Sequence, residues 1–130
     1  MIRIVLAIIA IFVAWGVMDF IIHGKLLEST YESTASLWRP MDEMNMTLMY
    51  FVSLLVATCF VLIYSLLIQS KSLAQGIKYG LLFGLATGIS MGFGSYSYMP
   101  IPMDLAWGWF LGTLAETLVA GSIVGAIVKQ

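Results

Sequence analysis

The sequence predicts an all-α integral membrane protein: a bundle of four transmembrane helices joined by short loops. Of its 130 residues, 61% are apolar and only 10% are charged, whereas soluble domains are about 45–50% apolar and about 25% charged. Four apolar segments reach the length of about 20 residues that a helix needs to cross a bilayer core of roughly 30 Å. None shows the strict alternation of a barrel strand, so we expect helices.

The four predicted spans form one domain over residues 1–130, at about residues 2–22, 44–68, 76–96 and 105–128. Basic residues flank the spans unequally. One side would carry Arg3, Lys71, Lys78 and Lys129, and the other Lys25 and Arg39. Because cytoplasmic flanks are enriched in Lys and Arg, we expect both termini to be cytoplasmic and the outer loop 23–43 to face the opposite side.

The outer loop carries an amphipathic pattern. Leu27, Tyr31 and Trp38 recur at helical spacing, while Glu28 and Glu32 fall on another face. An apolar stripe with aromatic residues is typical of a helix that lies in the membrane interface. We therefore expect a short interfacial helix in this first outer loop.

The third span carries five glycines spaced four residues apart, and the fourth span has two more at the same spacing. They are Gly76, Gly80, Gly84, Gly88 and Gly92, followed by Gly108 and Gly112. Small residues at this spacing let membrane helices approach closely. Since the connection between the two spans is short, we expect these glycine faces to meet as a glycine zipper. A glycine-lined translocation path is the alternative interpretation.

Glu116 is the residue that packing explains least. It lies about halfway along the fourth span, roughly 18 Å from the outer end at 1.5 Å per residue. An ionised carboxylate at that depth costs at least about 2.5 kcal/mol, and no basic residue lies at the same depth. We therefore expect a protonated carboxyl that either carries protons or is hydrogen-bonded to a nearby hydroxyl, from Thr87 or Ser90 on the third span or Thr113 or Thr117 on the fourth.

Asp19 and His23 lie four residues apart near the outer end of the first span. Side chains at this spacing share one face of a helix, and Trp15 continues the same stripe inward. The pair could hold a proton or contribute two metal ligands. A structural role at the interface is the interpretation that we favour.

Three methionines, Met41, Met44 and Met49, gather on the outer side. Thioethers are soft ligands that favour Cu(I), although methionine is also a common filler of apolar gaps. We expect no cofactor and keep an outward-facing Cu(I) site as an alternative. The single Cys59 and the single His23 exclude a disulfide framework and a zinc site built from Cys and His within one chain.

Several short motifs together carry a resemblance. They are the HGKLL sequence at residues 23–27, LWRP at 37–40, the glycine-rich stretch 80–92, Trp107 and Trp109, and GSIVG at 121–125. As a set they resemble small four-helix bacterial proteins grouped as a domain family of unknown function. The resemblance implies a multi-pass protein of the bacterial inner (plasma) membrane. It brings no activity, substrate or site residue.

Net charge and the set of reactive side chains exclude further classes of function. A net charge of −1 leaves no positive excess for phosphates, so we do not expect nucleic acid as a partner. The absence of a nucleophile–base pair argues against an enzyme. Our leading hypothesis is a non-enzymatic accessory subunit that packs into a larger membrane assembly or a homo-oligomer, with the lipid bilayer and other membrane chains or copies of itself as partners. The alternatives are a small proton-coupled transporter or channel that uses Glu116 and an outward-facing Cu(I)-binding protein.

Overall fold

The computed structural model describes residues 1–129 and shows an all-helical chain. Helix accounts for 84% of the residues, and no strand occurs in the described part. Three helical stretches are long and apolar enough to cross a membrane: Ile2–Leu26, Met46–Leu67 and Met103–Ile127. The all-α prediction is therefore confirmed, and the chain has the helices of a membrane protein.

Four long helices make up most of the chain: α1 (Ile2–Ile21), α3 (Met46–Leu67), α4 (Leu73–Ile89) and α5 (Met103–Ile127). α1 and α4 continue into the π-helical segments Ile22–Leu26 and Ser90–Gly94. The loop after α1 contains the short helix α2 (Glu28–Ser33) and the 3₁₀ turns Ala35–Leu37 and Met41–Glu43.

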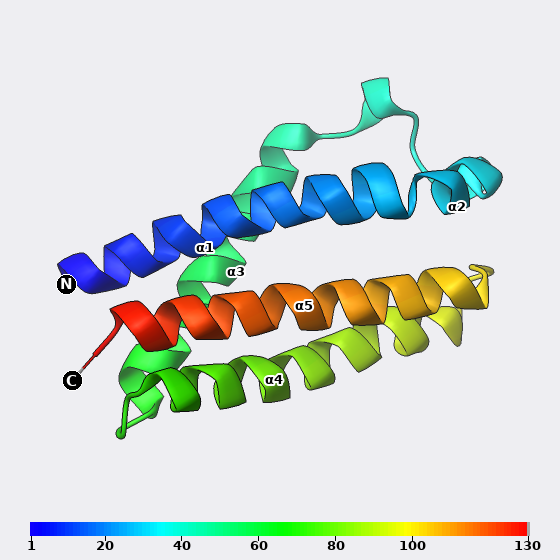
Figure 1. The fold of residues 1–130 in the computed structure, drawn as a ribbon. Helices are drawn as coiled ribbons and strands as arrows, with labels where there is room; N and C mark the ends of the chain where they lie inside the picture. Colours follow the sequence, from blue (N-terminus) through cyan, green and yellow to red (C-terminus); the bar gives the residue numbers. More distant parts are fainter. Residues whose placement is uncertain (130) are drawn as a thin grey trace.

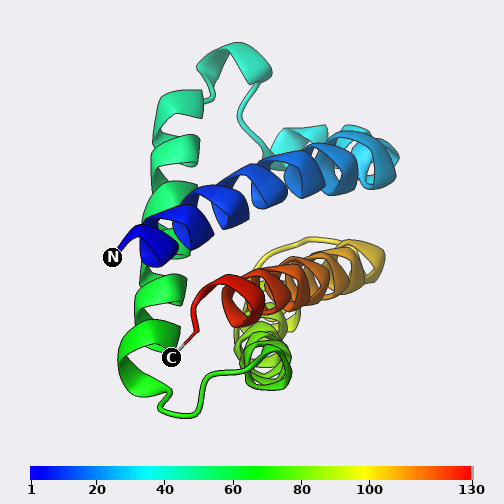
Figure 2. The same cartoon turned by 60° about the vertical axis from the view of Figure 1, so that its left-hand side comes forward.

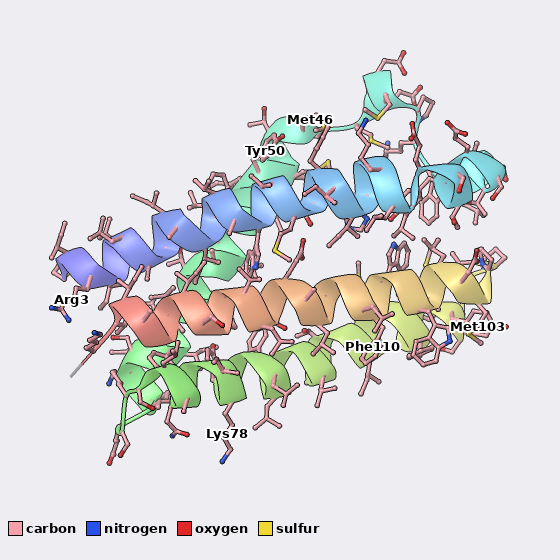
Figure 3. The ribbon with its side chains drawn as sticks, in the orientation of Figure 1. Arg3, Met46, Tyr50, Lys78, Met103 and Phe110 are labelled. Atoms are coloured by element: carbon pink, nitrogen blue, oxygen red, sulfur yellow. The ribbon has the colours of Figure 1, made fainter. Side chains whose placement is uncertain are left out.

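Three of the long helices, α1, α4 and α5, lie alongside one another, whereas α3 crosses them obliquely (Figures 1 and 2). The termini and the α3–α4 connection lie at one end, which we call the inner end (Figure 1). The α4–α5 turn and α2 lie at the opposite, outer end. Arg3 and Lys78 lie toward the inner end and Met103 lies at the outer end (Figure 3). A bundle of four aligned helices is therefore not observed.

The crossing of α3 follows from where its contact residues lie. Ala57, Phe60, Val61 and Tyr64 are fully buried in a cluster with side chains of α1 and α5, and all four belong to the inner half of the helix. In the outer half, residues 46–56, no side chain is buried. Membrane helices pack closely through small residues, and this half presents bulky ones. Its inner half therefore carries the contact with the other helices.

α4 is not among the helices that are long and apolar enough to cross a membrane. It has 17 residues of α-helix before its π-helical segment, and glycine at every fourth position leaves it with little apolar side-chain surface. The predicted third span, residues 76–96, therefore has a helix whose composition suits close contact with a neighbour better than contact with lipid.

The glycine face of α4 packs against α5. A β-carbon on Gly76 would overlap the carbonyl oxygen of Gly121, and one on Gly80 would overlap that of Thr117. The same face continues toward the outer end through Gly84, Gly88 and Gly92, where added β-carbons would meet Thr117, Phe110 and Ala106. The absence of side chains on α4 is therefore what allows the two backbones to approach.

The prediction that Gly108 and Gly112 form the α5 side of this contact is wrong. Added β-carbons there would meet Leu27 and Ile22 instead. The helical period explains the difference, because Gly112 and Gly121 are nine residues apart, which at 3.6 residues per turn is about two and a half turns. The two glycines therefore lie on opposite sides of α5.

Candidate functional site

The predicted stripe of α1 faces α5 at the level of Glu116. Trp15 is buried, and its indole Nε1 donates a hydrogen bond of 2.9 Å to the backbone carbonyl of Glu116. Asp19, one turn further along α1, is the acidic side chain whose charge acts on the Glu116 carboxyl. The structure therefore joins two acidic residues that the sequence analysis treated separately.

The Glu116 carboxyl is incompletely satisfied. Its Oε1 atom is buried and has no hydrogen-bond partner among the described residues. The hydroxyls of Thr87 and Thr117, two of the predicted partners, donate instead to the carbonyls of Phe83 and Leu114 in their own helices, at 2.7 and 3.0 Å. Thr117 is the residue of α5 that faces α4, and the backbone carbonyl of Glu116, one position earlier, faces Trp15 of α1.

His23 extends the site toward the outer end. Its Nε2 atom lies 3.8 Å from Oδ1 of Asp19, so the predicted pairing of these two residues is observed. Its Nδ1 atom lies 2.7 Å from the Tyr31 hydroxyl. Both Asp19 and His23 remain almost half exposed, with 46% and 43% of the side chain accessible. The site therefore runs from a partly buried acid to more accessible polar groups.

Tyr31 anchors the outer loop to α5. Its hydroxyl accepts a hydrogen bond of 2.7 Å from the indole Nε1 of Trp109, and Leu27, Tyr31 and Trp38 pack against a cluster that contains Leu105 and Trp109. Burial raises the pKa of Tyr31, an effect opposed by the hydrogen bond from Trp109 and reinforced by the charge of Asp19. The outer loop therefore packs on α5, and the prediction that it lies in the membrane interface stays a prediction.

These contacts define a polar chain of five residues, Glu116, Asp19, His23, Tyr31 and Trp109. No Lys or Arg in residues 1–129 makes an ion pair with either acid. Lys25, the basic residue closest in sequence to Asp19, lies over the ring of Phe20, 5.6 Å from its centroid. Phe20 is 65% exposed.

The polar chain has no counterpart toward the inner end. There the space between α1, α3 and α5 is filled by apolar side chains that are fully buried, among them Ile11, Phe60, Val61 and Val124. The contact of the Trp15 and Phe60 rings, with centroids 6.1 Å apart, closes this core just inside Glu116. The carboxyl pair is therefore connected to the outer end only, within the described part of the chain.

The other candidates lie apart from the polar chain. Met41 is 75% exposed in its 3₁₀ turn, Met49 is exposed near the start of α3, and Met44 lies between them in the sequence. No group of three or more His, Cys, Asp or Glu side chains that could hold a metal occurs in the described residues. The copper alternative, which depends on thioethers, stays a prediction.

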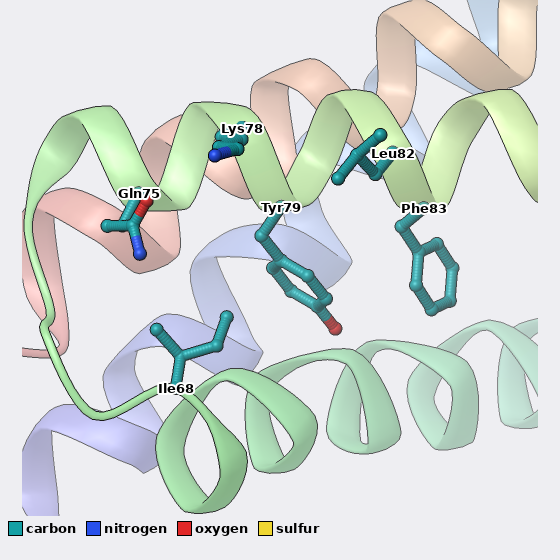
Figure 4. Close-up of a pocket in the computed structure, with 6 residues that line it drawn as sticks. All are labelled: Ile68, Gln75, Lys78, Tyr79, Leu82 and Phe83. Carbon is teal, nitrogen blue, oxygen red and sulfur yellow. The ribbon is translucent and has the colours of Figure 1, made fainter.

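A separate groove lies between the inner ends of α3 and α4 (Figure 4). It encloses about 430 Å³ and is lined by Ile68, Gln75, Lys78, Tyr79, Leu82 and Phe83. The hydroxyl of Tyr79 donates a hydrogen bond of 2.8 Å to the backbone carbonyl of Phe60. Tyr79 therefore ties α4 to α3, and it makes no contact with the polar chain around Glu116.

Comparison of the chain with protein-family models, with curated proteins and with solved structures gives no match.

Proposed function

We propose that this chain is a non-enzymatic, four-span membrane protein that binds and releases a proton at the carboxyl pair of Asp19 and Glu116, as a small proton-coupled transporter does. The observation that carries the proposal is the meeting of these two acids between α1 and α5, with Oε1 of Glu116 buried and unpaired. α1, α3, α5 and α4 with its π-helical extension would be the four spans.

Two neighbouring carboxylates cannot both carry a charge cheaply when one of them is partly buried, because like charges repel and the buried Oε1 atom of Glu116 has lost water. The pair therefore holds a shared proton. Its release leaves two negative charges without a basic partner, which favours any conformation that lets water or a cation reach Glu116. The protonated and the deprotonated pair thus favour different conformations, and this difference is what couples proton binding to a structural change.

The distribution of basic residues supports the orientation. Arg3 and Lys78 lie toward the inner end of the structure (Figure 3), and Lys71 precedes α4 at the same end. We propose that this end is cytoplasmic, in the inner membrane of a bacterium. The polar chain then opens to the external side.

Labelling with a hydrophobic carbodiimide tests the proposal, because this reagent reacts with protonated carboxyls inside a membrane. The protein in nanodiscs is labelled between pH 5 and pH 9, and the modified peptide is identified by mass spectrometry. We expect Glu116 to be labelled, and we expect the labelling to decrease as the pH rises. Asp19→Asn should change this pH dependence, since it removes the neighbouring charge. Asp104→Asn, at the first turn of α5, is the matched control and should leave it unchanged. Absence of labelling at every pH would overturn the proposal.

A packing subunit is the second candidate, and the outer half of α3 favours it. Residues 46–56 are apolar, and none of their side chains is buried. A photo-reactive residue at Leu55 should then form cross-links to protein, whereas the same residue at Val13, on the exposed face of α1, should react with lipid. Reaction with lipid alone at both positions would argue against the subunit role.

A further inference from the structure

We propose that protons reach Glu116 from the outer side through Tyr31, His23 and Asp19, in that order. This inference rests on the proposed function, because it names the route to the same carboxyl pair. Each step joins side chains from different segments: Tyr31 in α2, His23 in the π-helical extension of α1, Asp19 in α1 and Glu116 in α5.

Hydrogen-bond chemistry allows proton movement from Tyr31 to His23 in the outer part of this route. The indole N–H of Trp109 is a donor only, so the Tyr31 oxygen must accept from it. The hydroxyl hydrogen of Tyr31 is then free to point at Nδ1 of His23, 2.7 Å away. A neutral imidazole that accepts at Nδ1 carries its hydrogen on Nε2. That atom faces Oδ1 of Asp19.

The proton balance follows from this arrangement. Tyr31 passes its hydroxyl proton to Nδ1 of His23 and takes one from external water, so its charge does not change. The imidazolium then gives its Nε2 proton to the Asp19 carboxylate, across a gap of 3.8 Å that a small side-chain rotation closes. Asp19 shares that proton with Glu116. Rotation of the half-exposed imidazole ring returns its hydrogen to the side that faces Asp19.

The groups that surround His23 determine which side chains could pass a proton toward Glu116. The contacts of His23 are Asp19 of α1 and the Tyr31 hydroxyl of α2, and Lys25 is turned to the ring of Phe20. The outer end of α5 is covered by the docked loop, where Ile101 and Leu105 are buried. The inner side is closed by the packed core around Phe60. Because Asp19 and His23 are themselves almost half exposed, direct protonation of these two side chains is the competing route, and the comparison of Tyr31→Phe with the parent separates it from passage through Tyr31.

The test measures how fast Glu116 is protonated when only the external pH is lowered. The protein is placed in liposomes with a strongly buffered lumen, and cleavage by a glutamate-specific protease at the exposed Glu43 of the outer loop identifies the molecules whose outer end faces out. Time-resolved infrared spectroscopy follows the carboxylic C=O band that is missing in Glu116→Gln. Tyr31→Phe keeps the ring and removes the hydroxyl, and His23→Asn removes the titrating group. Tyr98→Phe, at an exposed tyrosine of the outer end, is the matched control.

We expect Tyr31→Phe and His23→Asn to slow the appearance of the band by about 10²-fold, the lower end of what a positioned proton-transfer group contributes. The final amplitude of Tyr31→Phe and the rate of Tyr98→Phe should equal those of the parent. Parent-like rates in both variants would overturn the route while leaving the carboxyl pair as the proton site. A parent protein whose Glu116 band does not respond to pH at all would instead remove the proposed function, and the route with it.

Discussion

Substitution of Gly76 by alanine tests the packing that holds α5, and therefore Glu116, in place. The added β-carbon would overlap the carbonyl oxygen of Gly121 and lie 2.6 Å from the Cα atom and 2.8 Å from the nitrogen of Gly125. Carbon atoms in favourable contact are about 3.5–4.0 Å apart. The obstructing atoms are backbone atoms, so no side-chain rotation relieves the overlap, and α4 must move away from α5.

The expected cost can be estimated. Overpacking of this kind costs about 1–3 kcal/mol, and the better helix propensity of alanine returns up to about 1 kcal/mol. At Gly16 on α1, an added β-carbon meets no atom within 4 Å, so Gly16→Ala carries only the propensity gain. We therefore expect Gly76→Ala to be less stable than Gly16→Ala by about 1–3 kcal/mol.

The assay is reversible unfolding in mixed micelles, in which the fraction of denaturing detergent is increased and helix content is followed by circular dichroism. Gly84→Ala should fall between the two variants, because its closest contacts are the side chains of Thr117 and Leu114, which can rotate. Equal unfolding free energies for Gly76→Ala and Gly16→Ala would refute the close contact of α4 with α5.

Three further predictions follow from the outer end. Burial raises the folded-state pKa of Tyr31 above its ordinary value of 10.0, so the packing of the outer loop on α5 keeps its full stability below pH 10 and loses stability as the pH rises beyond that value. Hydrogen exchange of residues 28–33 should therefore become faster above pH 10 than its intrinsic pH dependence explains, and Tyr31→Phe should abolish this extra increase. If the outer methionines hold Cu(I), the purified protein should bind it near stoichiometrically and lose it when Met41, Met44 and Met49 are all changed to Leu; binding that survives this change would exclude the site. A reporter that is active only in the cytoplasm should give a signal at the C-terminus and none within residues 28–36, and the opposite pattern would refute the orientation.

Local spacing was enough to predict part of the site. Asp19 and His23 are four residues apart on one helix, so their pairing depends only on the helical period. The positions of the long helices likewise follow from apolar runs, whose length is set by the membrane. Contacts that need the rotation of one helix against another were not predicted, since the partners expected for Glu116 were hydroxyls of the third and fourth spans and not Asp19.

The pattern on α5 did contain a signal for that rotation. Gly112, Glu116 and Ala120 follow one another at intervals of four, while Thr117, Gly121 and Gly125 follow at the same interval one position later. Only the second series meets the glycines of α4. The docking of Tyr31 on Trp109 had no such signal, because the two residues are 78 positions apart and the loop between α1 and α3 must fold back to join them. The oblique crossing of α3 was likewise not predictable from the spacing of its residues, because α3 is apolar along its whole length and only its inner half is buried.

One infrared measurement tests the carboxyl pair of Asp19 and Glu116 most directly. Spectra of the parent protein in nanodiscs at pH 7 are compared with those of Glu116→Gln and Asp19→Asn, which keep the shape of each side chain and remove its titration. We predict a protonated carboxyl band in the parent that is lost in Glu116→Gln and shifted in Asp19→Asn, because the two acids share one proton. Carboxylate bands for both residues at pH 7, with no protonated band, would show that another molecule supplies a cation and would contradict the shared proton.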